Sequence, residues 1–202
     1  MPKFTEAEKE KIRLEMMRNA HQCFIAKGLK NTSIEEITSS VSIAKSSFYV
    51  FFESKEMLYL ELLAFEGEEI ERRVWPKVEG EKDICKAIKI YLQEMSSALE
   101  SNILTQRLIT NIEEYNMVTR KINNEYSATK TLRSIVPLME FIKKNKGSDK
   151  LINEDIQVIA GVIRAALAMV LHKKDLGENI YPRVQEILFD AVANELTRGF
   201  SQ

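Results

Sequence analysis

The chain has 202 residues with a formal net charge of −1, and 45% of its residues are hydrophobic. This hydrophobic content is sufficient for a globular core, and the near-zero charge excludes any argument for nucleic-acid binding from bulk positive charge. Only seven Gly and four Pro occur, and this scarcity of helix breakers predicts an all-α fold in place of a turn-rich β fold.

The sequence also predicts a soluble, cytoplasmic protein without a membrane partner. Residues 1–6 have no apolar signal core. The longest apolar run, 158–171, is interrupted by Arg164 and is shorter than the ~20 residues that a membrane span needs.

Two helices are predicted at the N-terminus. The first covers about residues 6–27, where apolar residues recur with helical spacing, and Gly28 follows as a left-handed stop. The second is short. Two residue pairs have the spacing of a capping box at its start: Ser33 with Glu36, and Thr32 with Glu35.

A turn around Ser42 separates this second helix from a third short helix, predicted over about 44–50. Ser54 then caps a fourth helix, which is expected to end near Trp75 because Pro76 follows. Further helices are expected near 82–101, 103–117, 122–145, 153–173 and 181–199.

Polar and Gly-containing segments indicate the breaks between these later helices. They are expected at 101–102, around Asn116, at 145–149 and at 177–179. Pro137 is expected to kink or split the segment 122–145.

The segment 33–50 has the size of a helix-turn-helix, in which one helix braces a second that lies in the major groove of DNA. A small apolar core between the helices is expected from Ile34, Ile37, Val41, Ile43 and Phe48. The exposed face offers short polar groups and a cation: Lys45, Ser46 and Ser47. The Tyr49 hydroxyl and the Lys55 ammonium, at the start of the next helix, can reach phosphate oxygens.

The stretch Ile43–Glu56, IAKSSFYVFFESKE, resembles the core motif of the tetracycline-repressor (TetR) family. The resemblance covers about residues 10–60 and extends upstream to Ala20, Phe24, Gly28, Thr32, Ser33, Ile34 and Ile37. Ser42 and Ser46 stand where the family commonly has Gly. A turn that requires a positive φ would be strained at Ser42.

The resemblance implies a helix-turn-helix DNA-binding domain at 1–53, followed by a ligand-binding and dimerisation domain at 54–202. It implies a homodimer that binds a pseudo-palindromic double-stranded DNA operator and an unknown small-molecule effector that releases it, as a repressor. DNA contacts are expected from Thr32, Ser33, Ala44, Lys45, Ser46, Ser47, Tyr49 and Lys55. For Thr32 and Ser33, helix capping alone is an equal explanation.

A subunit interface is predicted from the segment 156–171, which is apolar on more than one face, together with the apolar stripe of the last helix. Two such helices from each subunit would form a four-helix bundle, whereas the alternative is a core helix within one subunit. Arg164 is expected to be buried and paired with an acid, or to bind an anionic ligand. The candidate acids are Glu113, Glu114 and Asp155.

The sequence contains no pattern that indicates an enzyme. The two cysteines, Cys23 and Cys85, lack metal-binding spacing, and the two histidines, His21 and His172, form no ligand pair, so neither a metal nor a cofactor is expected. Phosphate-binding Gly motifs are also absent from the sequence. The alternative function is a helical interaction protein of the same fold that has lost specific DNA binding.

Overall fold

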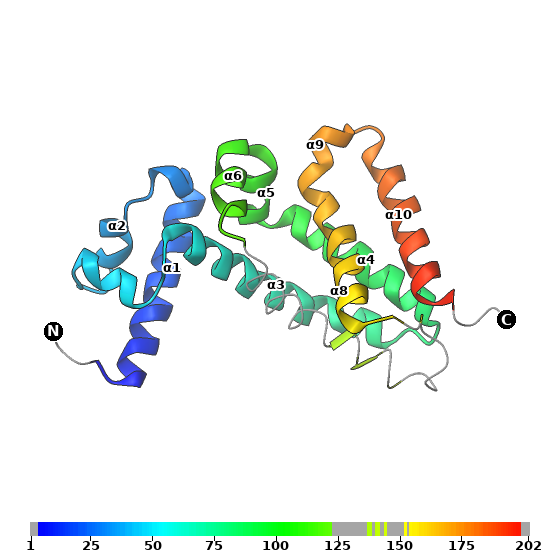
Figure 1. Cartoon of the computed structure of the whole chain (residues 1–202), viewed down its shortest axis with the longest axis horizontal. Coiled ribbons are helices and arrows are strands. Elements are labelled where there is room, and N and C mark those ends of the chain that lie inside the picture. Colours follow the sequence, from blue (N-terminus) through cyan, green and yellow to red (C-terminus); the bar gives the residue numbers. More distant parts are fainter. Residues whose placement is uncertain are drawn as a thin grey trace. The chain divides into compact units, whose positions relative to one another are not determined.

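The computed structural model describes residues 4–122, 137–138, 140–141, 144, 152 and 154–198. These residues form helices, turns and loops, with no strand among them, so the predicted all-α fold is confirmed for this part of the chain (Figure 1). They divide into two compact units, the first made of residues 1–65 and 110–122 and the second of residues 66–109 and 123–202. The first unit is larger than the predicted domain 1–53. The predicted division into a DNA-binding domain and a ligand-binding domain stays a prediction.

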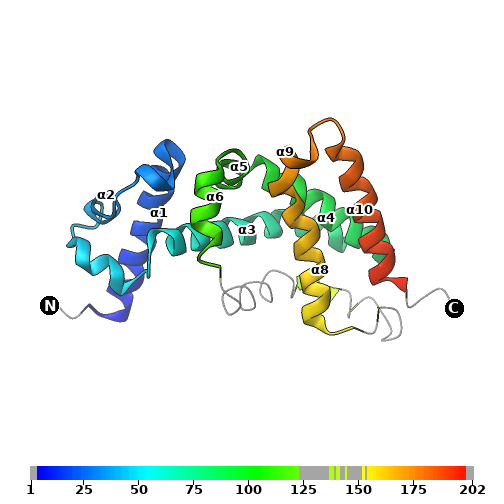
Figure 2. The same ribbon diagram turned by 45° about the horizontal axis from the view of Figure 1, so that its top comes forward.

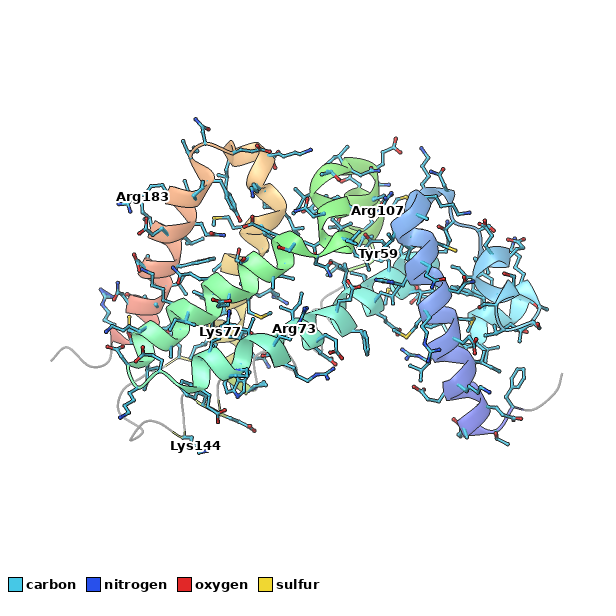
Figure 3. All side chains as sticks on the ribbon, turned by 180° about the vertical axis from the view of Figure 1, so that it is seen from behind. Tyr59, Arg73, Lys77, Arg107, Lys144 and Arg183 are labelled. Carbon is cyan, nitrogen blue, oxygen red and sulfur yellow. The ribbon has the colours of Figure 1, made fainter. Side chains whose placement is uncertain are left out.

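The first unit contains α1 (Glu6–Asn31), α2 (Ile34–Ser39), the 3₁₀ helix η1 (Lys45–Val50), the start of α3 (Lys55–Glu79), and α6 (Ile112–Thr119). A capping box between Thr5 and Glu8 starts α1. Gly28 takes a positive φ of 86°, after which the helical turns continue to Asn31, past the predicted end. In Figure 3, Tyr59 of α3 lies beside α1, where its ring centroid is 5.2 Å from that of Phe24.

Ser42, in the turn between α2 and η1, has a φ of 53° and is the only non-glycine residue with a positive φ in the described part of the chain. The expected strain at this position is therefore confirmed, since the left-handed conformation brings Cβ close to the following carbonyl oxygen. The positive φ lies within the five residues between Ser39 and Lys45, in which the chain changes direction between α2 and η1.

We expect Ser42→Gly to raise the free energy of unfolding by about 0.5–1 kcal/mol, because glycine relieves the Cβ contact but adds freedom to the unfolded chain. The matched control is Ser40→Gly, since Ser40 is also exposed but has an ordinary φ of −63°. Urea unfolding followed by circular dichroism would measure both. A gain at Ser40 equal to that at Ser42 would contradict the explanation.

The second unit contains the rest of α3, α4 (Ile84–Ser101), α5 (Ile103–Thr110), α8 (Ile156–Ala168), the 3₁₀ helix η2 (Met169–His172), α9 (Lys173–Leu176) and α10 (Tyr181–Leu196). In the two ribbon views α4, α8 and α10 lie side by side (Figures 1 and 2), and each of the three packs on the other two. Their buried side chains form one apolar core, which includes Ile88, Leu92, Ile163 and Phe189.

Polar contacts also join the helices of this unit. Glu100 of α4 accepts hydrogen bonds from the Tyr181 hydroxyl, at 2.9 Å, and the Lys173 ammonium, at 2.7 Å. Lys77 of α3, labelled in Figure 3, pairs with Glu94 of α4 at 2.6 Å. These contacts fix α4 against the elements that flank it.

Several predicted helix boundaries are wrong. Pro76 does not end α3, which continues to Glu79, because a proline one turn from a helix end removes only one backbone hydrogen bond. The expected helix 103–117 is split into α5 and α6 at Asn111, whose side chain accepts from the amides of Glu113 and Glu114. The expected break around Asn116 therefore lies inside α6.

The last two predicted helices also differ in detail. The helix expected over 153–173 is divided into α8, η2 and α9, and the helix expected over 181–199 ends as α10 at Leu196. The turn expected at 177–179 is present, with Gly177 at a φ of 90°. The helix expected over 122–145, including the kink at Pro137, falls mostly outside the described residues.

Glu71 of α3 is buried in the second unit and accepts a 3.3 Å hydrogen bond from the Tyr91 hydroxyl. Burial raises the pKa of the Glu71 carboxyl from 4.5 to about 7; the Tyr91 hydrogen bond opposes this shift and the nearby Glu68 charge adds to it. Because the pKa is higher in the folded state, the protonated carboxyl favours folding below pH 4.5, and this contribution is lost as the pH rises through about 7.

We therefore expect Glu71→Gln to stabilise the protein at pH 8 by about 1–2 kcal/mol, after allowance for partial solvation, and to have little effect at pH 4.5. Urea unfolding at both pH values would measure the difference. Glu79→Gln, at the exposed end of α3, is the control. An effect of Glu71→Gln that does not change with pH would argue against a buried, protonated carboxyl.

Candidate DNA-binding surface

The segment from α2 to η1 has the form of a helix-turn-helix, and local contacts stabilise it. A capping box starts α2, in which the Ser33 hydroxyl accepts from the Glu36 amide at 3.2 Å and a Glu36 carboxylate oxygen accepts from the Ser33 amide at 2.8 Å. The Asn19 side chain of α1 donates to the Ile37 carbonyl at 3.1 Å, which holds α2 against α1.

Phe48 of η1 is the central core residue of this segment. Its side chain is fully buried, and its ring lies 5.6 Å from that of Phe52 and 5.5 Å from that of Tyr49, measured between centroids. Because the Tyr49 ring stands edge-on to a buried neighbour, it projects outward in a defined orientation. The aromatic core therefore determines how η1 presents its exposed side chains.

The outward face of η1 carries most of the residues that the sequence predicted as DNA contacts. Ala44, Lys45 and Ser46 are exposed and Ser47 is half-buried. Tyr49 is 58% exposed. This is a surface of short side chains with one cation and one phenol, the chemistry that suits a DNA groove and its phosphates.

Lys45 does not point freely into solvent. Its ammonium forms a 2.6 Å ion pair with Glu35 of α2, and both side chains remain more than half exposed. The hydrogen bond between them raises the pKa of Lys45 and lowers the pKa of Glu35, since each group stabilises the charged form of the other.

Three predicted contact residues have other roles in the structure. Thr32 is 1% exposed and its hydroxyl donates to the Gly28 carbonyl at 2.7 Å. The Lys55 ammonium donates to the Leu29 and Thr32 carbonyls at 2.9 and 2.5 Å, and so satisfies carbonyl groups at the end of α1. Ser33, half-buried, is engaged in its capping box.

As DNA contacts, Thr32 and Lys55 therefore stay predictions, and the structure gives both side chains partners within the protein. Thr32 is enclosed by the protein, and Lys55 has its donors directed at backbone carbonyls. We leave both residues out of the contact surface proposed below. Ser33 stays a prediction, with capping as its demonstrated structural role.

Two residues on this surface were missed by the sequence analysis. Val50, at the end of η1, is 61% exposed although it is apolar. As an apolar residue close to Phe48 in the sequence, it gives no local signal of this exposure. Glu35 was considered only as a partner in capping, and no local pattern indicates its pairing with Lys45 across the turn.

A second surface of interest is an apolar face in the other unit, formed by α8 and α10. We define the apolar face as Val158, Val162, Ala165, Ile187 and Ala191, all of which are exposed. Val158 is 50% and Ile187 54% exposed. Arg164, expected to be buried, is exposed in the single chain because it lies on the outward side of α8.

The stretch Ile156–Leu176 is long and apolar enough to cross a membrane by length and composition, with 33% of its apolar window buried. Core helices of soluble proteins can be equally long and apolar. This stretch is moreover divided into α8, η2 and α9. Among the described residues, no group of three or more His, Cys, Asp or Glu side chains could hold a metal ion.

The described chain is thus an all-helical protein whose N-terminal unit presents a helix-turn-helix. The model of the family "Bacterial regulatory proteins, tetR family" matches residues 17–62. The matched segment contains the helix-turn-helix and is similar to this family of regulators.

A relative in Bacillus subtilis (strain 168), the uncharacterized HTH-type transcriptional regulator YuxN, is 41% identical over 58 residues. The match covers 29% of this chain and 19% of YuxN, so the chain spans about a fifth of that relative.

Solved structures extend the likeness of fold to most of the chain. The complex of RolR with its ligand resorcinol has a TM-score of 0.59 at 16% identity, covering 94% of this chain and 96% of RolR. A protein from Shewanella sp. PV-4, assigned to the tetR family of transcription regulators, has a TM-score of 0.56 at 17% identity, covering 89% of this chain and 96% of that one.

Proposed function

We propose that this chain is a sequence-specific, DNA-binding transcriptional regulator. The observation that carries the proposal is the exposed face of η1, held by buried Phe48 and placed within a segment that matches the tetR family. Lys45 contacts a phosphate. Tyr49, with Ala44, Ser46, Ser47 and the exposed Val50, lies in the major groove.

The proposed regulator acts as a homodimer on a pseudo-palindromic operator. The apolar face of α8 and α10 supports this proposal, because several exposed apolar side chains on two helices that pack together are typical of a protein interface. A two-fold axis through this face would form a four-helix bundle from two copies of the chain. The same interface would cover the apolar part of Ile156–Leu176 in a cytoplasmic protein.

A small-molecule effector is proposed to bind the second unit and release the operator, so that the protein is a repressor without enzymatic activity. The likeness of fold supports this proposal, because RolR, which shares the fold, is in complex with resorcinol. Binding of the effector shifts the equilibrium only if its affinity differs between the DNA-bound and free conformations.

The ion pair at Lys45 also favours a second candidate function, an interaction protein that has kept the fold and lost specific DNA binding. In that case the pairing with Glu35 would be a solvated surface contact with no role in DNA recognition. Selection of a preferred sequence from random double-stranded DNA separates the two, because only a regulator enriches one.

We expect Tyr49→Ala to weaken binding to the selected duplex about tenfold, since it removes both a groove contact and a phosphate donor. Lys45→Ala should weaken it less, about threefold, through one lost phosphate contact. Fluorescence anisotropy with a labelled duplex would measure both affinities. The control is Ile112→Ala, which alters a side chain in α6 that is 68% exposed.

Tyr49→Phe separates the two parts of the tyrosine contribution, because it keeps the ring and removes the hydroxyl. All variants should keep the circular dichroism spectrum and the oligomeric state of the wild type. Unchanged affinity in both Tyr49→Ala and Lys45→Ala would refute the proposed contact surface.

A further inference from the structure

Acids within the first unit engage many of its cations. Lys30 pairs with Glu113 at 2.8 Å, Lys45 pairs with Glu35 at 2.6 Å, and Lys27 and Arg13 also have acidic partners. The pairing matters for the proposed function, because affinity for DNA comes largely from protein cations that neutralise phosphates and release counterions. A cation already paired within the protein contributes less.

The pair between Lys45 and Glu35 is the one that lies on the exposed face of η1. Glu35 belongs to the first turn of α2, and Lys45 is the first residue of η1, so the contact bridges the turn that contains Ser42. The Lys45 and Glu35 side chains are 56% and 58% exposed, which leaves both accessible to a DNA phosphate and to salt. The opposite pKa shifts of the two groups agree with a formed ion pair.

We infer that Glu35 is a built-in competitor of the DNA phosphate for Lys45, and that it lowers both the affinity and the salt dependence of DNA binding. This inference rests on the proposed function. A phosphate must displace the Glu35 carboxylate before Lys45 can bind it. The freed carboxylate then takes up a cation from solution, which offsets the counterion released from the DNA phosphate. Glu35 thus weakens the sequence-independent part of binding, and specific contacts from Tyr49 and its neighbours gain relative weight.

The test compares wild type, Glu35→Gln, Lys45→Ala and the double variant, all as the full chain. Glutamine keeps the size of the side chain and removes its charge. The probes are two fluorescein-labelled duplexes, one that wild-type protein enriches from random DNA and one with the same bases scrambled. Anisotropy is recorded from 50 to 200 mM salt. Glu178→Gln, at an exposed turn residue of the second unit, makes the same change in net charge.

Glu35→Gln is expected to tighten binding to both duplexes about threefold to tenfold at low salt, and to steepen the slope of log affinity against log salt by about 0.9. The gain should disappear in the double variant, because without Lys45 there is no ammonium group that removal of the Glu35 charge could free for a phosphate. Glu178→Gln should leave affinity and slope unchanged.

A gain of equal size with and without Lys45 would overturn the inference, since Glu35 would then act by direct repulsion of DNA. No gain from Glu35→Gln would overturn it as well. If wild type enriches no sequence, the proposed regulator fails, while a duplex of arbitrary sequence still decides whether Glu35 competes for Lys45. Absence of binding to either duplex by both wild type and Glu35→Gln would overturn both proposals.

Discussion

Replacing Phe48 by alanine is expected to lower the free energy of unfolding by about 3–4 kcal/mol, the usual cost of removing a buried aromatic ring. Phe48 is fully buried, and its ring contacts those of Tyr49 and Phe52. The loss is a large part of the total stability of a small domain, about 5–15 kcal/mol. DNA binding should be lost with it, because Phe48 is the buried residue of η1.

Phe65→Ala is the matched control for Phe48→Ala. Phe65 is also in the first unit but is 50% exposed, so its truncation should cost less than about 1 kcal/mol. Urea unfolding followed by far-ultraviolet circular dichroism measures both variants. Equal losses of stability in the two variants would mean that the aromatic cluster around η1 is not a core.

The second large effect is expected at the proposed subunit interface. Ala165→Glu should convert the dimer into a monomer, because it places an unpaired charge on the apolar face of α8. A penalty of about 3 kcal/mol would raise the dimer dissociation constant more than 100-fold. DNA binding should weaken in parallel, since one subunit can occupy only half of a two-fold operator.

Sedimentation velocity over a range of protein concentrations would measure the association of this variant. The control is Gln93→Glu, which places the same charge on an exposed position of α4. We expect this control to remain dimeric and folded. A dimer that persists in Ala165→Glu would place the interface on another surface.

Much of the fold could be predicted because local patterns determine it. The spacing of apolar residues gave the positions of α1, α4 and α10 to within a few residues. Capping residues located the start of α2, where the Ser33–Glu36 pair is present. The positive φ of Ser42 was expected from the turn that a helix-turn-helix requires.

The features that were missed depend on contacts between residues distant in sequence or on small balances at helix ends. Lys55 has the position of a phosphate ligand in sequence, but its ammonium reaches carbonyls 23 and 26 residues earlier in the chain. Glu35 meets Lys45 only after the turn is formed. Pro76 lies inside α3 and does not end it, because the loss of one hydrogen bond near the end of the helix is tolerated.

The central claim is sequence-specific DNA binding, and binding of wild-type protein to DNA from immediately upstream of its own gene tests it most directly. The fragment would be labelled and followed by fluorescence anisotropy at several salt concentrations, beside scrambled DNA of equal length. The account predicts tight binding to the native fragment alone, in the range of about 10⁻⁸–10⁻¹¹ M, weakening with salt. Equal, weak binding to both duplexes would contradict it.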